Sequence, residues 1–255
     1  TATDADGNDL TFSISGAEIS IDEDTGVITF ASAPDYETKS SYSATVTVSD
    51  GTNSTTQDIT VAINDLNDNS PTFTSSASFT ADENQTAIGT VTATDADASS
   101  TLVYSLAGTD AASLTLNSAT GVLAFTSAPD YETKSSYSAT VTASDGTNST
   151  VQDIAISINN LNDNSPSFTS SSSFTADENQ TAIGTVTATD ADANTTLAYS
   201  LGGTDAASLT LNSATGVLAF TSAPNYETKS SYSISVTASD GTNSTTQDIT
   251  ISIND

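Results

Sequence analysis

The chain of 255 residues lacks Cys, Met, Trp and His, and its only cations are Lys39, Lys134 and Lys229. Without Cys there is no disulfide framework, and without His or Cys neither a zinc site nor a nucleophilic thiol has its usual ligands. Three Lys against 32 Asp and Glu give a formal net charge of −29. Such a chain cannot displace the counterions of nucleic acid, and it avoids anionic membrane surfaces unless a divalent cation bridges the two.

Long hydrophobic runs are missing as well. No stretch of about 18 apolar residues exists, so no membrane insertion is expected. There is neither a starting Met nor a signal peptide, and we expect the chain to be a piece of a longer protein. High negative charge often indicates disorder, but 35% of the residues are hydrophobic and they follow a regular pattern. The sequence therefore predicts a folded chain.

The hydrophobic pattern is that of β-strands. From Tyr137 to Ser144 apolar and small polar residues alternate without a break, and the alternation continues from Ile154 to Ile158. Small, β-branched and hydroxyl-bearing residues dominate, and no long stretch has helical period. The fold class is therefore predicted to be all-β.

Internal repeats organise the chain. Ser-Asp-Gly recurs with its Asp at positions 50, 145 and 240, and residues 79–98 match residues 174–193 at every position. The repeats predict three domains, at residues 1–70, 71–165 and 166–255, of which the first lacks its opening strand. Within the second, seven strands are expected, which suits a Greek-key β-sandwich. They are 78–81, 87–94, 102–106, 113–116, 122–125, 136–144 and 150–158.

The acidic residues gather at the ends of these strands. If successive strands run in opposite directions, the loops after the first and fifth strands and the end of the seventh strand share one pole of a domain. The loops after the second and sixth strands share the other pole. The bottom of one domain therefore meets the top of the next with many carboxylates. Between domains 1 and 2 these are Asp35, Glu37, Asp65, Asp68, Asp95, Asp97 and Asp145; between domains 2 and 3 they are Glu83, Asp130, Glu132, Asp163, Asp190, Asp192 and Asp240.

A stereotyped linker crosses each of these two joints. Leu-Asn-Asp-Asn-Ser-Pro occurs at Leu66–Pro71 and again at Leu161–Pro166. Its amides Asn67, Asn69, Asn162 and Asn164 add further oxygens. Two carboxylates about 4 Å apart repel by roughly 4 kcal/mol at an effective dielectric of 20, so a joint of this kind needs cations. Ca²⁺ accepts six to eight oxygen ligands in flexible geometry, whereas Mg²⁺ is more demanding. We therefore expect several Ca²⁺ ions at each joint, and a joint that stiffens when they bind.

Taken together, these motifs resemble those of cadherin repeats, in tandem arrays of the kind also found in bacterial surface proteins. The resemblance covers all three domains. It rests on Asp82-Glu-Asn, the Asp-Ala-Asp pairs, Asp130-Tyr-Glu, Ala143-Ser-Asp-Gly and Asp65-Leu-Asn-Asp-Asn, in the family's order. It implies seven-stranded sandwiches with Ca²⁺, typically three ions, at each interdomain joint, held by the residues named above.

The sequence departs from the family pattern at two of the ligand positions. Asn160 stands where the first linker has Asp65, and Asn225 replaces the Asp of the third Asp-Tyr-Glu. These sites are expected to bind more weakly or to lose an ion. There is also no Trp for the strand-swap adhesion of vertebrate cadherins.

Competing interpretations of the acidic residues and the lysines have less support. Acidic surfaces often serve solubility alone, but scattered charge would not focus on two poles. Asp4-Ala-Asp-Gly fails as an EF-hand because Gly stands at position 4 of the loop and Ser15 at position 12. Paired carboxylates could serve a glycosidase, yet thin repeated sandwiches offer no pocket, so no enzyme is predicted. Lysines in a Glu-Thr-Lys-Ser-Ser setting favour surface Lys–Glu pairs over isopeptide bonds.

Two functions from different classes follow. The first is a Ca²⁺-rigidified stalk or filament segment of a large secreted bacterial adhesin or matrix protein at the cell surface, in contact with neighbouring repeats of the same chain. The second is a binding module whose individual repeats recognise like chains or extracellular polysaccharide. A strand supplied by a neighbouring chain could complete the first domain in a filament.

Overall fold

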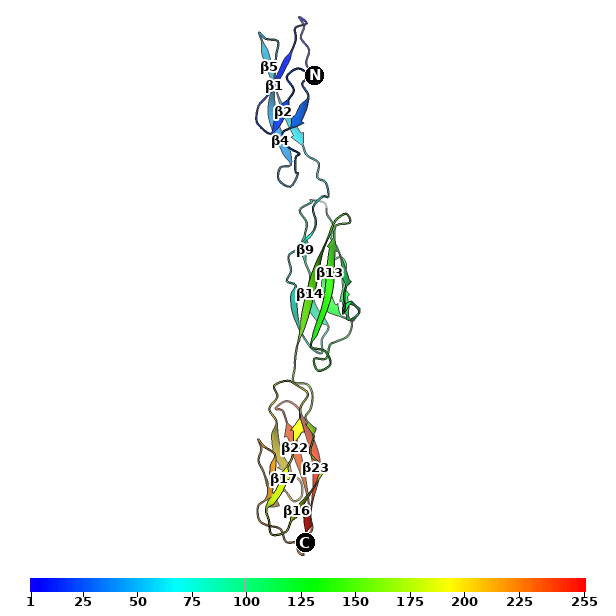
Figure 1. The fold of residues 1–255 in the computed structure, drawn as a ribbon, viewed down its shortest axis with the longest axis vertical. Coiled ribbons are helices and arrows are strands. Elements are labelled where there is room, and N and C mark those ends of the chain that lie inside the picture. The colour runs from blue at the N-terminus through cyan, green and yellow to red at the C-terminus, as the bar shows by residue number, and fades with distance from the viewer. Residues whose placement is uncertain (99) are drawn as a thin grey trace.

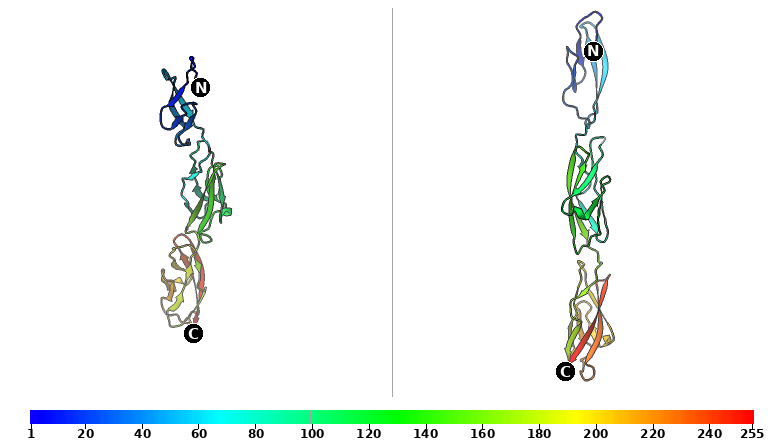
Figure 2. Two further views of the ribbon diagram at one scale, coloured as in Figure 1. Left: turned by 45° about the horizontal axis from the view of Figure 1, so that its top comes forward. Right: turned by 90° about the vertical axis from the view of Figure 1, so that its right-hand side faces the viewer.

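The structure, a computed structural model, describes residues 1–98 and 100–255. Three β-rich bodies follow one another along the long axis, and the two termini lie at opposite ends (Figure 1). Two further views keep the bodies in a single row (Figure 2). We name them the first, second and third unit, after residues 1–70, 71–165 and 166–255. These boundaries remain predictions, whereas the all-β fold is confirmed.

The second unit contains a complete sandwich. One sheet has the strand order β10-β13-β14-β7 and the other β11-β12-β8, and β6 pairs with β9 alone. All pairs are antiparallel except β14 with β7. Its strands are β6 (Thr72–Phe73), β7 (Ser78–Asp82), β8 (Ala87–Thr90), β9 (Ala93–Thr94), β10 (Val103–Ala107), β11 (Leu114–Leu116), β12 (Val122–Phe125), β13 (Ser136–Ser144) and β14 (Ser149–Asn159).

The third unit repeats this arrangement. Its sheets have the orders β16-β23-β22-β19 and β17-β21-β20, with β15 paired to β18. A 3-10 turn directly precedes β11 in the second unit and β20 in the third, at Ala111–Ser113 and Ala206–Ser208. The strands are β15 (Ser167–Phe168), β16 (Ser173–Asp177), β17 (Ala182–Thr185), β18 (Ala188–Thr189), β19 (Ala198–Gly202), β20 (Leu209–Leu211), β21 (Val217–Phe220), β22 (Ser231–Ser239) and β23 (Ser244–Asn254).

The first unit has fewer strands. One sheet has the order β1-β4-β5, and β2 pairs with β3. The strands are β1 (Thr11–Ile14), β2 (Ile19–Ile21), β3 (Ile28–Phe30), β4 (Ser41–Ser49) and β5 (Ser54–Ala62). In this unit β5 pairs only with β4, whereas β14 and β23 each carry a parallel strand on their other edge. One long side of the first unit is therefore uncovered within the described residues.

The core of the second unit lies between its two sheets. Val91, Val141, Ala143 and Ile156 are fully inaccessible to solvent. Burying one side chain of the size of Val or Ile contributes about 1.5–3 kcal/mol to folding. Gly121 lets the turn before β12 approach this core, because a Cβ on it would stand 2.0 Å from the carbonyl oxygen of Val91. No helix among the described residues has the length and apolarity to cross a membrane.

Most predicted strands of the second unit appear, with three differences. The predicted strand 87–94 is broken, because β8 pairs with β12 while β9 pairs with β6. The break is fixed by distant partners: the backbone N–H of Val91 donates to Gly121 O at 2.9 Å, and that of Ala93 donates to the Tyr104 hydroxyl, also at 2.9 Å. The short strand β6 was not predicted, and the predicted strand 113–116 begins as a 3-10 turn.

Candidate metal centres at the two joints

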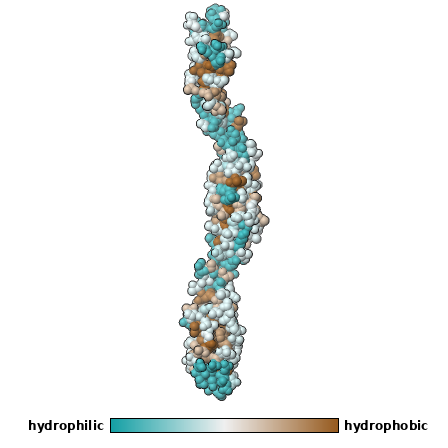
Figure 3. All heavy atoms as spheres, viewed as in Figure 1, coloured by the Kyte–Doolittle hydropathy of each residue, from teal (hydrophilic) through white to brown (hydrophobic). Residues whose placement is uncertain are grey.

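The acidic residues do meet where the units meet. Joint 1 lies between the first and second units and joint 2 between the second and third. Hydrophilic side chains gather at both (Figure 3). Among the described residues, the only buried charged side chains of the chain are Glu83, Asp97 and Asp192, which are 2%, 5% and 4% exposed. All three belong to these joints. Burying an ionised carboxylate is costly unless it is paired or coordinates a metal.

Carboxylates form tight groups at both joints. Within each group one oxygen per residue lies within 4.8 Å of the others. The described residues of joint 1 form two such groups, which share Asp97: Glu37, Asp65 and Asp97; and Asp95, Asp97 and Asp145. Those of joint 2 form three groups: Glu83, Asp130 and Glu132; Glu132, Asp163 and Asp192; and Asp190, Asp192 and Asp240.

Two predicted carboxylates lie outside these groups. Asp35 accepts hydrogen bonds from Thr38 and from the backbone N–H of Glu37, so it shapes its own turn. Asp68 accepts from Nδ2 of the neighbouring Asn69 at 3.1 Å. Their equivalents in joint 2, Asp130 and Asp163, do belong to groups. The second joint is thus the more densely acidic of the two.

Glu83 organises joint 2. The backbone N–H of Tyr131 donates to its Oε2 and that of Leu161 to its Oε1, both at 2.7 Å. It therefore ties the turn after β7, the turn before β13 and the second linker together. Asn84, next to it, has the left-handed φ of 63°, which Asn tolerates better than most residues. From there its Nδ2 donates to Asp163.

The linker amides surround the buried aspartates. The backbone N–H and Nδ2 of Asn69 donate to the two oxygens of Asp97 at 3.1 and 2.7 Å. Asn164 makes the same pair of bonds to Asp192 at 2.9 and 2.8 Å. The side-chain amide of Asn67 faces Asp97 and Asp145 and can take two orientations. In one, Nδ2 donates to these carboxylates at 3.1 and 2.8 Å; in the other, Oδ1 faces them and adds an oxygen to the group. Asn162 does the same towards Asp192 and Asp240.

Several buried oxygens of the joints have no hydrogen-bond donor among the described residues. They are Asp65 Oδ1, Asp95 Oδ2, Asn160 Oδ1 and Asp190 Oδ2. Buried polar atoms are normally satisfied, so oxygens that converge without donors fit a cation better than an empty space. Since every available ligand is an oxygen, the donor set suits hard cations such as Ca²⁺ or Mg²⁺ and does not suit zinc or copper.

The pKa values of two glutamates at the joints are raised by their surroundings. Burial raises the pKa of Glu132, against the lowering effect of its own backbone amide, and the charges of Glu83 and Asp192 raise it further. For Glu37 a hydrogen bond from its own amide acts downward, but desolvation and contacts with Asp35 and Asp65 outweigh it and the pKa rises. Both pKa values are therefore raised mainly by desolvation, and neighbouring carboxylates raise them further.

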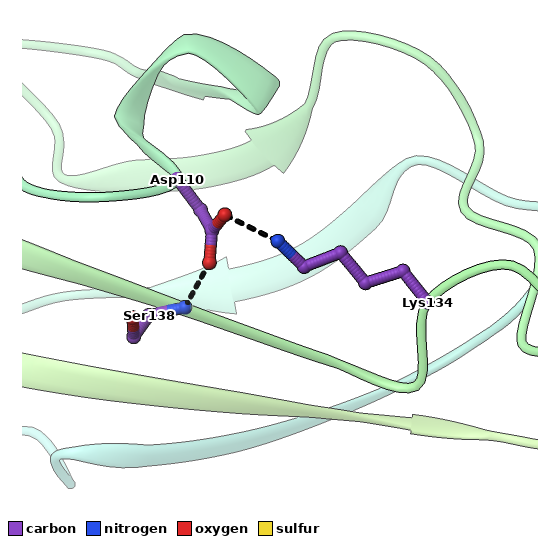
Figure 4. A network of polar contacts seen from close by, with 3 residues as sticks. All are labelled: Asp110, Lys134 and Ser138. Atoms are coloured by element: carbon purple, nitrogen blue, oxygen red, sulfur yellow. Dashed lines mark hydrogen bonds and ion pairs between the residues drawn. The ribbon is translucent and has the colours of Figure 1, made fainter.

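The lysines do not neutralise the joints. Lys134 pairs with Asp110, whose other oxygen accepts from the backbone N–H of Ser138 at 2.8 Å (Figure 4). Its Nζ also lies 4.6 Å from the ring centroid of Tyr137. Lys229 makes the equivalent pair with Asp205, and Lys39 pairs with Glu18. Of the predicted Lys–Glu pairs, only that of Lys39 involves Glu. The hydrogen bond from Lys134 lowers the pKa of the Asp110 carboxyl, which favours an ion pair between the two side chains.

Three amides that contact the linkers were not predicted from the sequence. They are Asn84, Asn148 and Asn243, which all donate hydrogen bonds to a linker. Asn148 and Asn243 occupy the same place in the repeated Asp-Gly-Thr-Asn motif, and that recurrence was the available signal.

Comparison with known proteins identifies the family. The Cadherin domain model matches residues 76–159 and 172–254, so the chain belongs to the cadherin family. It is 32% identical over 257 residues to mouse Cadherin EGF LAG seven-pass G-type receptor 2, covering 92% of this chain and 9% of that protein. It is 33% identical over 181 residues to human Cadherin-23, covering 66% of this chain and 5% of that protein. The chain thus spans less than a tenth of these relatives.

Solved structures agree on the fold. A structure of mouse Cadherin-23 EC22-24 superposes with a TM-score of 0.78 at 24% identity, covering 100% of this chain and 88% of that one. A structure of mouse clustered PcdhgC3 EC1-3 gives 0.81 at 22% identity, covering 96% and 89%. Family membership confirms tandem β-sandwich repeats with acidic clusters between them, an extracellular, adhesion-type segment, and the absence of enzymatic function.

Proposed function

We propose that this chain is a Ca²⁺-rigidified stalk or filament segment of a large extracellular adhesin or matrix protein, through which cells or surfaces adhere. The observation that carries the proposal is the set of carboxylate groups at the two joints, with three buried carboxylates and, among the described residues, no lysine paired with them. In Asp65, Asp95 and Asp190 an oxygen is buried without a donor. Ca²⁺ would supply both the missing charge and a partner for those oxygens.

Each joint would hold cations through residues of two successive units. In joint 2, Glu83, Asp130 and Glu132 come from the second unit and Asp190, Asp192 and Asp240 from the third. The linker contributes Asp163 and the amides of Asn162 and Asn164. Because ions bound across the gap tie both units, their free energy of binding also orders the joint.

The bacterial setting is a finer part of the same proposal. Its support is compositional: two nearly identical repeats, many Ser and Thr, and no Cys. The relatives named above come from mouse and human and add nothing to it.

Small-angle scattering and thermal melting test the calcium proposal. With Ca²⁺ we expect a straight rod, and with a chelator a more bent ensemble and a lower melting temperature. Mg²⁺ at matched ionic strength separates specific coordination from screening. Replacing Asp97 and Asp192 together by Asn is expected to abolish the Ca²⁺ response. Asp248→Asn, which removes a charge from an exposed position in β23, is the matched control. Unchanged shape and melting temperature on chelation overturn the proposal.

A second candidate function is the binding of like chains by individual repeats. A structure of protocadherin gammaB7 EC3-6, which shares this fold at 23% identity, is a cis-dimer, and this supports the candidate.

Analytical ultracentrifugation of the chain over a range of concentrations, with Ca²⁺ and with a chelator, tests this second candidate. A concentration-dependent dimer supports it, and a monomer at every concentration excludes it. Recognition of polysaccharide has less support, because Tyr226, at 39%, is the only largely exposed aromatic side chain among the described residues.

A further inference from the structure

The last residue of one short turn is used differently in the three units. The motif Asp-Gly-Thr-Asn follows β4, β13 and β22, as Asp50–Asn53, Asp145–Asn148 and Asp240–Asn243. In each copy the Asp Oδ1 accepts from the backbone N–H groups of Thr and Asn at 2.6–2.7 Å. The backbone of the turn is therefore the same in all three, and any difference arises in the Asn side chain.

Where a linker arrives, the Asn side chain reaches it. Nδ2 of Asn148 donates to Asn69 O at 2.7 Å and lies 3.3 Å from Asn67 O. Nδ2 of Asn243 lies 3.3 Å from Asn162 O. In the first unit, where the described residues include no linker at this pole, Nδ2 of Asn53 turns back to Asp50 Oδ2 at 3.2 Å instead.

The hydrogen bonds made by Asn148 and Asn243 differ from the other hydrogen bonds of the linkers. The bonds from Asn69 to Asp97 involve a carboxylate of a candidate cation group, so they depend on what that carboxylate binds. The bonds of Asn148 and Asn243 to backbone carbonyls join neutral groups. They join no carboxylate and need no cation to form.

We infer that Asn148 and Asn243 are positioning residues, which fasten each linker to the top of the following unit whether or not a cation is present. By holding Asn67 and Asn69 in place, Asn148 keeps the oxygens of the linker beside Asp95, Asp97 and Asp145. The cation would then bind to a partly assembled site, which lowers the ordering cost of binding. This effect on cation affinity rests on the proposed function, whereas the fastening itself does not.

The test compares Asn148→Ala and Asn243→Ala with Asn53→Ala, the same change in a turn that holds no linker. Hydrogen exchange is measured in chelator, and Ca²⁺ affinity by titration calorimetry. In chelator, Asn148→Ala is expected to speed exchange of the Asn69 amide several-fold, and Asn243→Ala that of Asn164. The Ca²⁺ affinity of the altered joint is expected to fall about tenfold. Asn53→Ala changes neither quantity at either joint.

The outcomes separate the two claims. If linker exchange in chelator is the same in Asn148→Ala, Asn243→Ala and Asn53→Ala, the inference is wrong, even if the parent chain binds Ca²⁺. If exchange rises as expected but the parent chain binds no Ca²⁺, the fastening stands and the proposed function fails.

Discussion

The two joints use nearly the same residues but are not fastened alike. In joint 1, within the described residues, no hydrogen bond connects the linker Leu66–Pro71 to residues 1–65, whereas several connect it to the second unit. In joint 2 the linker is also bonded to the unit before it, through Glu83, Asn84 and Glu132. Within the described residues, the first linker is thus hydrogen-bonded to the unit that follows it, and the second linker to the units on both sides.

The residue before each linker also differs between the joints, and here joint 1 has the additional contact. In joint 1, Asp65 Oδ2 accepts from the backbone N–H of Ala98 at 3.0 Å, a contact across the joint. In joint 2 this position is Asn160, and its buried Oδ1 has no donor among the described residues. Joint 2 therefore combines the stronger protein contacts with one ligand charge fewer at this position. Rigidity without cations and affinity for them are separable properties of such a joint.

Removing Glu83 should give the largest effect. Glu83→Ala removes the carboxylate acceptor of the backbone N–H groups of Tyr131 and Leu161, and each of these hydrogen bonds to a charged group contributes about 1.5–3 kcal/mol. We expect a matching loss in the free energy of unfolding of the second unit, measured by urea titration in chelator. The control is Glu178→Ala, because Glu178 accepts only from Tyr226, at 3.1 Å, within the described residues. An equal loss in both variants contradicts the role assigned to Glu83.

Exchanging the residues before the linkers should shift cation affinity between the joints. Asp65→Asn removes a ligand charge from joint 1, and Asn160→Asp adds one to joint 2. Each change is expected to alter Ca²⁺ affinity about tenfold, which corresponds to about 1.4 kcal/mol, in opposite directions. Calorimetric titration of both variants and of the double exchange measures this. If Asn160→Asp binds no more tightly than the parent chain, the charge at this position does not set the affinity.

Asn84 should give a smaller effect, confined to joint 2. Asn84→Ala breaks the bond to Asp163 and is expected to cost about 1 kcal/mol. Asn179→Ala is the matched control: Asn179 has the same left-handed backbone, with φ of 60°, but no side-chain hydrogen bond among the described residues. The difference between the two variants in thermal melting isolates the bond from the backbone strain. Equal melting temperatures would show that the bond contributes nothing.

Acid should have the smallest and most diagnostic effect. Because the pKa values of Glu37 and Glu132 are raised in the folded chain, that chain binds their protons more tightly than the unfolded chain. Without cations, stability should therefore fall as pH rises through these pKa values, above the ordinary 4.5, and recover on acidification. With Ca²⁺ the sign reverses, because protons compete for the same oxygens. Melting curves from about pH 5 to pH 7, with and without chelator, check both signs.

The pH dependence that comes from Glu37 can be changed separately from that of Glu132. Asp65 contributes to the upward shift in the pKa of Glu37, so Asp65→Asn should reduce the pH dependence at joint 1 and leave joint 2 unchanged. A change at both joints would contradict the assignment of the shift to local contacts.

Much of this architecture was visible in the sequence, because it depends on local pattern. The alternation of β13 and the apolar run of β12 predicted their bounds, since a buried face imposes a period of two. Strand direction then predicted which acids share a pole. The break between β8 and β9 was not predictable, because its partners, Gly121 and Tyr104, are distant in the chain. The different roles of Asn53 and Asn148 were equally hidden, because their local sequences are identical.

The parallel pairing of β7 with β14 bears on how the chain carries tension. Five residue pairs, from Ser78 with Ala155 to Asp82 with Asn159, connect strands near the two ends of the second unit. A pull along the long axis slides these strands past each other, so their hydrogen bonds must break together rather than one after another. The third unit has the same pairing between β16 and β23. Under force, the second and third units should therefore outlast the joints between the units.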